Sequence, residues 1–489
     1  MFKKVKSIHL YLLSYFTVNI LFLNMYPFMH SDESWLSNLS RNILQNKSFK
    51  VTESVFDLYP RFPHSIKILF HSIQIIFLKL FGYNLFTFRL ISLIFGCIGL
   101  YFFYRILSKY CTKNIALIYT ILLSLNIQFI YASHFARQEI VLVCIEIIAL
   151  FLFSQKKYTY TTIVCAISIG IHPNSFIVAS VMGSIYLISL INKKIELRTF
   201  IFYILGLCIS AIIFILISIY LDNQFFYHYF NYGSTLNVDA NLIDKFKNFD
   251  NFYYKIYQMI SATYYTPDIR IYFYVFLVSS LYVLLKKRTL QNISIIIGII
   301  IINLAIIFIG RYNPTSIILM FPLFYLLLAN IDNKYFIITL FIISILNSSI
   351  NIYPYLNNDY ESYLNNIEQY VSSDSKVLAN LNTEYYFEND SLLDYRNLYY
   401  LKENNITFEE YIYNNNIEYI IYSEEMDFIY NSRPIWNIVY GNTYYYYEDM
   451  NIFLNENCNL IGEFTDSTYS MRIVRYQNEN YFVKIYQVK

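Results

Sequence analysis

Charge is scarce in this chain of 489 residues. Only 14% of the residues are Asp, Glu, Lys or Arg, whereas a typical soluble globular protein carries about 25%. Hydrophobic residues make up 56% of the chain, and the mean hydropathy is +0.39. Both values indicate a membrane protein. The charges are also balanced, 36 basic against 34 acidic, which gives no support for nucleic-acid binding, since that function requires a basic patch or stripe.

Cysteine is also rare, and its placement argues against two kinds of site. Of the six cysteines, four lie inside apolar runs: Cys97, Cys144, Cys165 and Cys208. Their spacing matches neither a disulfide framework nor a set of metal ligands, so we interpret them as small apolar packing residues. No cofactor is predicted. The adjacent acids Asp32 and Glu33 leave room for a divalent metal, but no cluster with ligand spacing indicates one.

Apolar runs long enough to span a membrane are abundant. Crossing the hydrocarbon takes roughly 20 apolar residues as a helix. We predict about eleven transmembrane helices, near residues 8–29, 85–107, 115–133, 138–153, 158–171, 174–191, 200–221, 269–285, 290–309, 313–330 and 334–352. The predicted fold class is therefore a polytopic α-helical membrane protein.

Basic residues between these runs predict the orientation. They gather in every second connection, around Lys3, Lys109, Lys156, Lys193, Lys286 and Lys334. Because Lys and Arg in short loops favour the cytoplasm, we expect a cytoplasmic N-terminus and an outer C-terminus in the cell (inner) membrane. The first span lacks a small-residue cleavage site, so we expect it to be retained.

This topology divides the chain into a membrane domain, residues 1–352, and a soluble outer domain, residues 353–489. The membrane domain has two large outer segments, 30–84 and 222–268. Within the first, polar residues interrupt the apolar run 64–81 at nearly helical spacing. This run is either a twelfth span or an amphipathic helix at the interface. We favour the interfacial helix, because a further span would put the following basic loops on the wrong side.

The outer domain alternates strand-like and helix-like stretches. We expect strands at 377–381, 417–423, 461–464 and 481–488, and helices at 360–371 and 407–415. This pattern predicts an α/β or α+β module. It contains no glycine-rich phosphate loop, so we interpret the domain as a cap or an acceptor-binding domain rather than a second catalytic unit.

Ionisable residues gather at the outer ends of the predicted spans. Because such residues are costly in a membrane, they tend to mark function. They are Asp32, Glu33, Arg89, His134, Arg137, Glu139, His172, Arg270 and Arg311. Their shared side indicates one cavity that faces outward.

Each of these residues also has a structural explanation. Arg89 and Arg270 can snorkel from helix ends, and Arg137 can pair with Glu139 on a loop. His172 can cap a helix break.

The stretch HSDESW, residues 30–35, also has both a structural and a functional interpretation. It predicts a helix N-terminus with Ser31 or Asp32 as N-cap and the acids in the first turn. Capping and catalysis are compatible. Because neighbours on a helix do not share a face, Glu33 either supports Asp32 or points away from it.

Short motifs follow in an order that resembles a known family. An Asp-Glu pair at 32–33 precedes Arg-Asn-Ile-Leu at 41–44, and Gly82 precedes Arg-Leu at 89–90. An Arg-x-Glu at 137–139 opens the fourth span, and a His-Pro stands at 172–173. In this order and sidedness the chain resembles the GT-C glycosyltransferases related to protein O-mannosyltransferases and lipid A aminoarabinose transferases. It departs from them where many relatives have Lys-Pro, because here Phe62 precedes Pro63.

The resemblance implies a GT-C-like enzyme that moves a hexosyl or pentosyl group from a polyprenyl-phosphate donor to a lipid, glycan or protein acceptor on the outer face, with inversion. It implies Asp32 as general base, while Glu33 positions the acceptor or raises the pKa of Asp32. Arginines are the donor-phosphate candidates, because their planar fork suits phosphate oxygens: Arg137, Arg311, Arg89 and Arg61. The substrate-binding candidates are Glu139, His172 and His64, and His64 or Arg61 would replace the missing lysine.

Two other classes compete with an enzyme. A transporter or flippase of a lipid-linked or small substrate would also place charges near spans, but transporters commonly show internal repeats and midplane polar residues. This chain shows no clear repeat, and its charges cluster at one face. A non-catalytic scaffold would leave the same-sided arginines unexplained. We therefore favour the enzyme.

Overall fold

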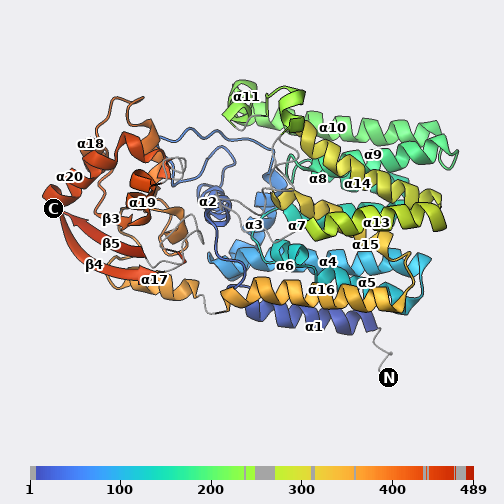
Figure 1. Cartoon of the computed structure of the whole chain (residues 1–489). Helices are drawn as coiled ribbons and strands as arrows, with labels where there is room; N and C mark the ends of the chain where they lie inside the picture. Colours follow the sequence, from blue (N-terminus) through green and yellow to red (C-terminus); the bar gives the residue numbers. More distant parts are fainter. Residues whose placement is uncertain are drawn as a thin grey trace.

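The structure is a computed structural model. It describes residues 7–235, 238–247, 270–309, 314–356, 359–432, 437, 440–466, 468–469 and 481–489. Two parts stand out in Figure 1: a long helical bundle at the N-terminal end of the colour scale and a smaller sheet-containing part at the C-terminal end.

The bundle helices coincide with the predicted spans. They are α1 (Ser7–Phe22), α4 (Leu85–Tyr110), α5 (Lys113–Ser124), α6 (Ile127–Ser133), α7 (Glu139–Ser154), α8 (Tyr158–Ser168), α9 (Ser175–Ile191), α10 (Leu197–Leu221), α13 (Arg270–Lys286), α14 (Leu290–Ile309), α15 (Met320–Leu328), which follows the 3₁₀ turn η1 (Pro314–Leu319), and α16 (Lys334–Ile352). The span expected at 115–133 is the pair α5 and α6, bent by 68°.

The structure confirms the predicted helices but not the predicted number of membrane crossings. Among the described residues, α4, α10, α14 and α16 are long and apolar enough to cross a membrane, and the bent pair α5–α6 would add a fifth crossing. The remaining apolar helices are shorter. The count of eleven therefore stays a prediction, whereas the apolar bundle makes the chain an integral membrane protein.

Close packing at a glycine positions the end of α6. A Cβ on Gly96 of α4 would lie 3.0 Å from the Cβ of Ser133 and 3.8 Å from a ring carbon of Phe129. The hydroxyl of Ser92, also on α4, donates a hydrogen bond to the Phe135 carbonyl at 2.7 Å. The segment 134–138, between α6 and α7, is thereby held against α4.

Two helices lie in the first outer segment, α2 (Ser31–Asn46) and α3 (Ile68–Phe81). On α3, His71 and Gln74 are buried, whereas Ile76 and Leu80 are exposed. The helix thus exposes apolar residues beside Lys79 while it buries two polar ones, and a helix of mixed character of this kind suits a membrane interface. The helix has 14 residues, fewer than the roughly 20 of a crossing, so the structure favours the interfacial alternative.

The C-terminal part contains a five-stranded mixed sheet with strand order β2-β1-β3-β5-β4. The strands are β1 (Val377–Ala379), β2 (Leu392–Asp394), β3 (Tyr419–Ser423), β4 (Cys458–Asp466) and β5 (Tyr481–Val488), and the helices are α17 (Tyr360–Glu368), α18 (Phe408–Asn414), α19 (Glu425–Ser432) and α20 (Tyr447–Asn457). β1 pairs in parallel with β2 and β3, while β5 pairs antiparallel with β3 and β4. β2 has no counterpart among the predicted strands.

The sheet-containing part is bound to α2, which lies between it and the bundle in Figure 1. Arg41 forms an ion pair with Glu384 and donates to the Phe387 carbonyl at 2.8 Å. Asn38 donates to Glu384 at 2.8 Å, and Ser34 donates to the Leu381 carbonyl at 2.8 Å. α2 is therefore fixed from both sides.

Candidate active site

α2 begins in the stretch HSDESW, and a histidine caps its first turn. The Nδ1 of His30 accepts a hydrogen bond from the Asp32 backbone N–H at 3.0 Å. Oε2 of Glu33 accepts one from the His30 N–H at 2.9 Å. This is a capping box with histidine in the place of the usual serine or threonine. The predicted N-cap, Ser31 or Asp32, is therefore wrong: both residues are already helical, because the imidazole nitrogen replaces a hydroxyl oxygen.

Glu33 points into the protein and forms a buried, two-pronged ion pair with Arg89 of α4. Nε and Nη2 of Arg89 each donate to a Glu33 oxygen at 2.8 Å, and both side chains are 0% exposed. Nη1 of Arg89 donates to the carbonyls of Leu23 and Pro27 at 2.8 and 2.9 Å. The Ala136 N–H donates to Glu33 at 2.9 Å. This network joins α2, α4, the end of α1 and the segment before α7.

The buried pair settles which way Glu33 points. It leaves α2 on the side away from Asp32, which is one of the two alternatives that the sequence left open. Arg89 is enclosed by its partners, and direct contact of Arg89 with phosphate or of Glu33 with substrate stays a prediction.

Asp32 is the accessible acid of the pair, with 27% of its side chain exposed. Nη1 of Arg137 donates to Asp32 Oδ2 at 2.8 Å, and Nη2 of Arg137 lies 3.0 Å from Glu139 Oε1. Arg137 and Glu139 are almost entirely buried. One guanidinium thus bridges two carboxylates, and the predicted pairing of Arg137 with Glu139 is present. Of the three side chains, Asp32 is the most exposed.

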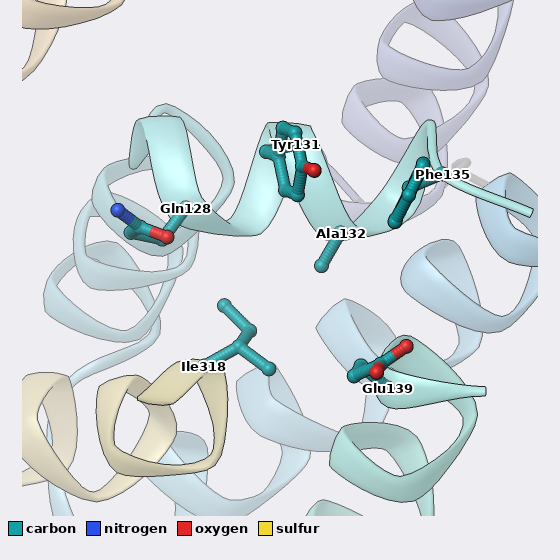
Figure 2. A pocket seen from close by; sticks show the side chains of 6 residues that line it. All are labelled: Gln128, Tyr131, Ala132, Phe135, Glu139 and Ile318. Carbon is teal, nitrogen blue, oxygen red and sulfur yellow. The ribbon is translucent and has the colours of Figure 1, made fainter. Parts of the chain in front are cut away.

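A cavity adjoins this triad. It is small and is lined by Gln128, Tyr131, Ala132, Phe135, Glu139 and Ile318. Figure 2 shows α6 on one side of the space, with Ile318 and Glu139 on the other. Apolar walls with a few convergent polar groups are typical of ligand sites. Because Glu139 lines the cavity and binds Arg137, the cavity and Asp32 belong to one site.

A second small cavity lies under the first outer loop, between α2 and α3. Its lining includes Glu53, Arg61, Phe62, His64 and His71. Arg61 donates to both Glu53 oxygens, from Nε at 2.9 Å and from Nη2 at 2.8 Å. Two of the predicted site residues, Arg61 and His64, therefore line a cavity different from the one beside Asp32.

Burial and charge set the protonation states around this second cavity. Burial alone would raise the pKa of the Glu53 carboxyl, but Arg61 holds it at about 2. Burial, together with the nearby cations Arg61 and Lys67, lowers the pKa of His64 to about 4. At neutral pH, Arg61 and Glu53 thus form a charge-neutral pair beside an uncharged imidazole. To bind a phosphate, Arg61 would have to share or leave Glu53.

The remaining predicted site residues are His172 and Arg311. His172 caps the turn before α9, where its Nδ1 accepts from the Asn174 N–H at 3.0 Å. The Asn174 amide in turn donates to Ser316 of η1 at 2.8 Å. Because Ile318 of η1 lines the cavity beside Glu139, this turn is connected to the site. Arg311 lies outside the described residues.

Three residues that line or adjoin the two cavities were not predicted from the sequence. Gln128 and Tyr131 line the cavity from α6, and Glu53 neutralises Arg61. The bend after Leu125, where the Asn126 side chain caps α6, is the feature that turns these α6 residues toward Glu139. Asn126 was a readable helix-start signal. Glu53 carried no motif. Within the described ranges, no group of three or more His, Cys, Asp or Glu side chains is arranged to hold a metal ion.

Comparison with known proteins supports the fold. No protein-family sequence model matches the chain, and no curated protein sequence matches it significantly. A solved structure of ArnT from Cupriavidus metallidurans bound to undecaprenyl phosphate is similar at a TM-score of 0.59 and 9% identity, over 98% of this chain and 97% of that chain. The same enzyme in its apo state is similar at a TM-score of 0.50 and 10% identity, over 98% and 97%.

These similarities define the class by fold: the chain is an integral membrane protein with the GT-C fold. Within that fold, it is similar over nearly its whole length to ArnT, a lipid A aminoarabinose transferase. At this level of identity the likeness concerns the arrangement of the chain and not its chemistry.

Proposed function

We propose that this protein is an inverting membrane glycosyltransferase, which moves a sugar from a polyprenyl-phosphate donor to a hydroxyl of a lipid, glycan or protein acceptor. The observation that carries the proposal is Asp32, an accessible carboxylate held by Arg137 beside a cavity in a GT-C fold. The undecaprenyl phosphate named in the similar ArnT structure supports a lipid-linked donor.

In this mechanism Asp32 is the general base. The acceptor oxygen attacks the anomeric carbon while its proton passes to a carboxylate oxygen of Asp32. The bond between that carbon and the phosphate oxygen breaks, and the polyprenyl phosphate leaves with the electron pair. A positioned base contributes about 10²–10⁴-fold to such a step. The ion pair with Arg137 favours the ionised form of Asp32 that can accept a proton.

Arg137 also serves the leaving group. Its guanidinium is held between Asp32 and Glu139, so it is already in place to share its positive charge with the phosphate as negative charge develops there. Arg311 remains a proposed second cation, and Glu139 and His172 remain proposed substrate contacts. Glu33 and Arg89 take a positioning role, because their buried pair ties α2 to the backbone beside Arg137.

The orientation belongs to the same proposal. With the N-terminus in the cytoplasm, Asp32 and the sheet-containing part, residues 353–489, face the outside of the cell membrane. A donor whose tail stays in the bilayer would reach a site at the end of the bundle without leaving the membrane.

The test separates an enzyme from a transporter. Purified protein in detergent is given a polyprenyl-phosphate sugar with radiolabel in the sugar and a panel of lipid, glycan and peptide acceptors. We expect label to appear on one acceptor class together with free polyprenyl phosphate. A transporter or flippase has no compartment to cross in detergent and would release neither product. Transfer that retains the anomeric configuration would contradict the single displacement.

A further inference from the structure

Six large apolar side chains are exposed on the second outer segment, and this set is called the apolar patch. It is formed by Phe226, Tyr227 and Phe230 of α11 (Phe225–Thr235) and by Leu242, Ile243 and Phe246 of the helical residues 242–247. These six side chains are between 49% and 69% exposed, and none carries a formal charge. A patch of large apolar side chains of this kind marks an interaction surface.

The patch continues a surface that already faces lipid. α10, which precedes α11, is strongly apolar, and only 6% of the residues in its most apolar stretch are buried. It has 25 residues, which at 1.5 Å per residue span about 37 Å. The hydrocarbon core is about 30 Å thick. The far end of α10 therefore reaches the membrane surface, and α11 begins only four residues beyond it.

We propose that this patch inserts into the interfacial layer of the lipid bilayer, so that α11 and residues 242–247 lie on the membrane as an anchor. The aromatic content of α11 fits this location, because amphipathic rings concentrate at the headgroup level. The exposed charges within residues 242–247, Asp244 and Lys247, pair with each other at 3.6 Å, so insertion depends on apolar burial rather than on anionic lipid. Figure 1 places α11 at the edge of the bundle, beyond the end of α10.

The inner side of the anchor contacts the wall of the second cavity. The His228 ring stacks on the Phe62 ring with centroids 3.4 Å apart. Its Nδ1 lies 2.6 Å from Oδ2 of Asp222, at hydrogen-bond distance. Tyr232 lies 5.9 Å from the Arg61 guanidinium. Lys245 donates to the carbonyl of Phe308, near the end of α14, at 3.1 Å. The anchor thus fixes the Phe62 loop and the end of α14 at a set height above the bilayer.

Fluorescence quenching tests the depth of the patch directly. Phe230→Trp and Phe246→Trp variants of the full chain are placed one copy per nanodisc in phosphatidylcholine brominated near the carbonyl end of the acyl chains, and the emission of the parent chain is subtracted. The control is Tyr413→Trp, at an exposed position of α18 in the sheet-containing part. All three changes replace one exposed ring by another, so the variants are expected to fold.

We expect strong quenching of the added tryptophan at 230 and 246 and none at 413. Replacing part of the lipid with phosphatidylglycerol should leave the quenching unchanged. If tryptophan at positions 230 and 246 is quenched no more than tryptophan at 413, the patch does not contact lipid and the proposal is wrong. The proposal is also wrong if a second copy of the chain, present in larger discs, protects these tryptophans from quenching by the lipid. The readout requires no catalysis, so it stands or falls separately from glycosyl transfer.

Discussion

At the scale of single residues, Asp32 and Glu33 divide two tasks. Consecutive side chains leave a helix about 100° apart, so Glu33 turns inward to Arg89 while Asp32 turns toward Arg137 and the cavity. The sequence predicted that the pair matters and that Arg137 and Glu139 lie nearby. It did not predict which acid takes which arginine, because that choice depends on where α4 and residues 134–138 pack.

The buried pair predicts a large stability effect for Arg89→Met. The substitution leaves Glu33 charged, fully buried and without its cation, which typically costs about 3–5 kcal/mol. We expect a correspondingly lower thermal midpoint in detergent. Arg105→Met on the same helix is the control, because Arg105 is exposed and its guanidinium donates to the hydroxyl of Tyr101 rather than to a carboxylate. A midpoint equal to that of the control would contradict the structural role of Arg89.

His64 predicts a specific dependence of stability on pH. Its folded pKa, about 4, lies below its ordinary value of 6.5, so the unfolded chain binds a proton more readily. The contribution of neutral His64 is therefore complete above pH 6.5 and is lost as the pH falls toward 4. We expect His64→Gln to lose less stability over this interval than the parent, measured by denaturation at each pH. His9→Gln, at an exposed histidine, should follow the parent; equal slopes for all three proteins would contradict the prediction.

At the scale of helices and strands, apolar length was the readable signal. Every predicted span coincides with a helix or helix pair, because a run of about 20 apolar residues has few alternatives. The bend between α5 and α6 was not predicted, since hydropathy continues through it. β2 was missed because three residues, Leu392–Asp394, are too few for a period of two to be recognised.

The burial of Glu146 on α7 predicts that this side chain lowers the stability of the protein. Its side chain is 0% exposed, and within the described part of the chain neither carboxyl oxygen has a hydrogen-bond partner. Burying a polar group in this way costs about 1–3 kcal/mol in proteins. We expect Glu146→Leu to raise the thermal midpoint, whereas Glu196→Leu, at an exposed position, leaves it nearly unchanged. A lower midpoint for Glu146→Leu would show that the bundle uses this carboxyl.

At the scale of the whole molecule, α2 connects the sheet-containing part to the site. Glu384 accepts hydrogen bonds from Asn38, Tyr83 and Arg41, and Arg41 lies on the same helix as Asp32. The sequence predicted a separate outer module but not this contact, because pairing across more than 300 residues leaves no local pattern. The contact gives the sheet-containing part a direct physical connection to the helix that carries Asp32.

Glu384→Gln is therefore expected to lower both stability and sugar transfer. The substitution removes the charge that compensates buried Arg41, while the amide keeps the size of the side chain. Glu388→Gln, four residues away and exposed, is the matched control for both measurements. Full transfer activity in a Glu384→Gln protein of lowered stability would separate the module from catalysis and contradict the coupling through α2.

The central claim, that Asp32 accepts the proton of the acceptor hydroxyl, is tested most directly by sugar transfer in Asp32→Asn. The amide keeps the shape and can still accept from Arg137, but it cannot take a proton. The account predicts a loss of about 10²-fold or more in kcat, with an unchanged thermal midpoint and with full activity in Asp449→Asn, an exposed acid on α20. Transfer by a folded Asp32→Asn protein at the rate of the parent would contradict it.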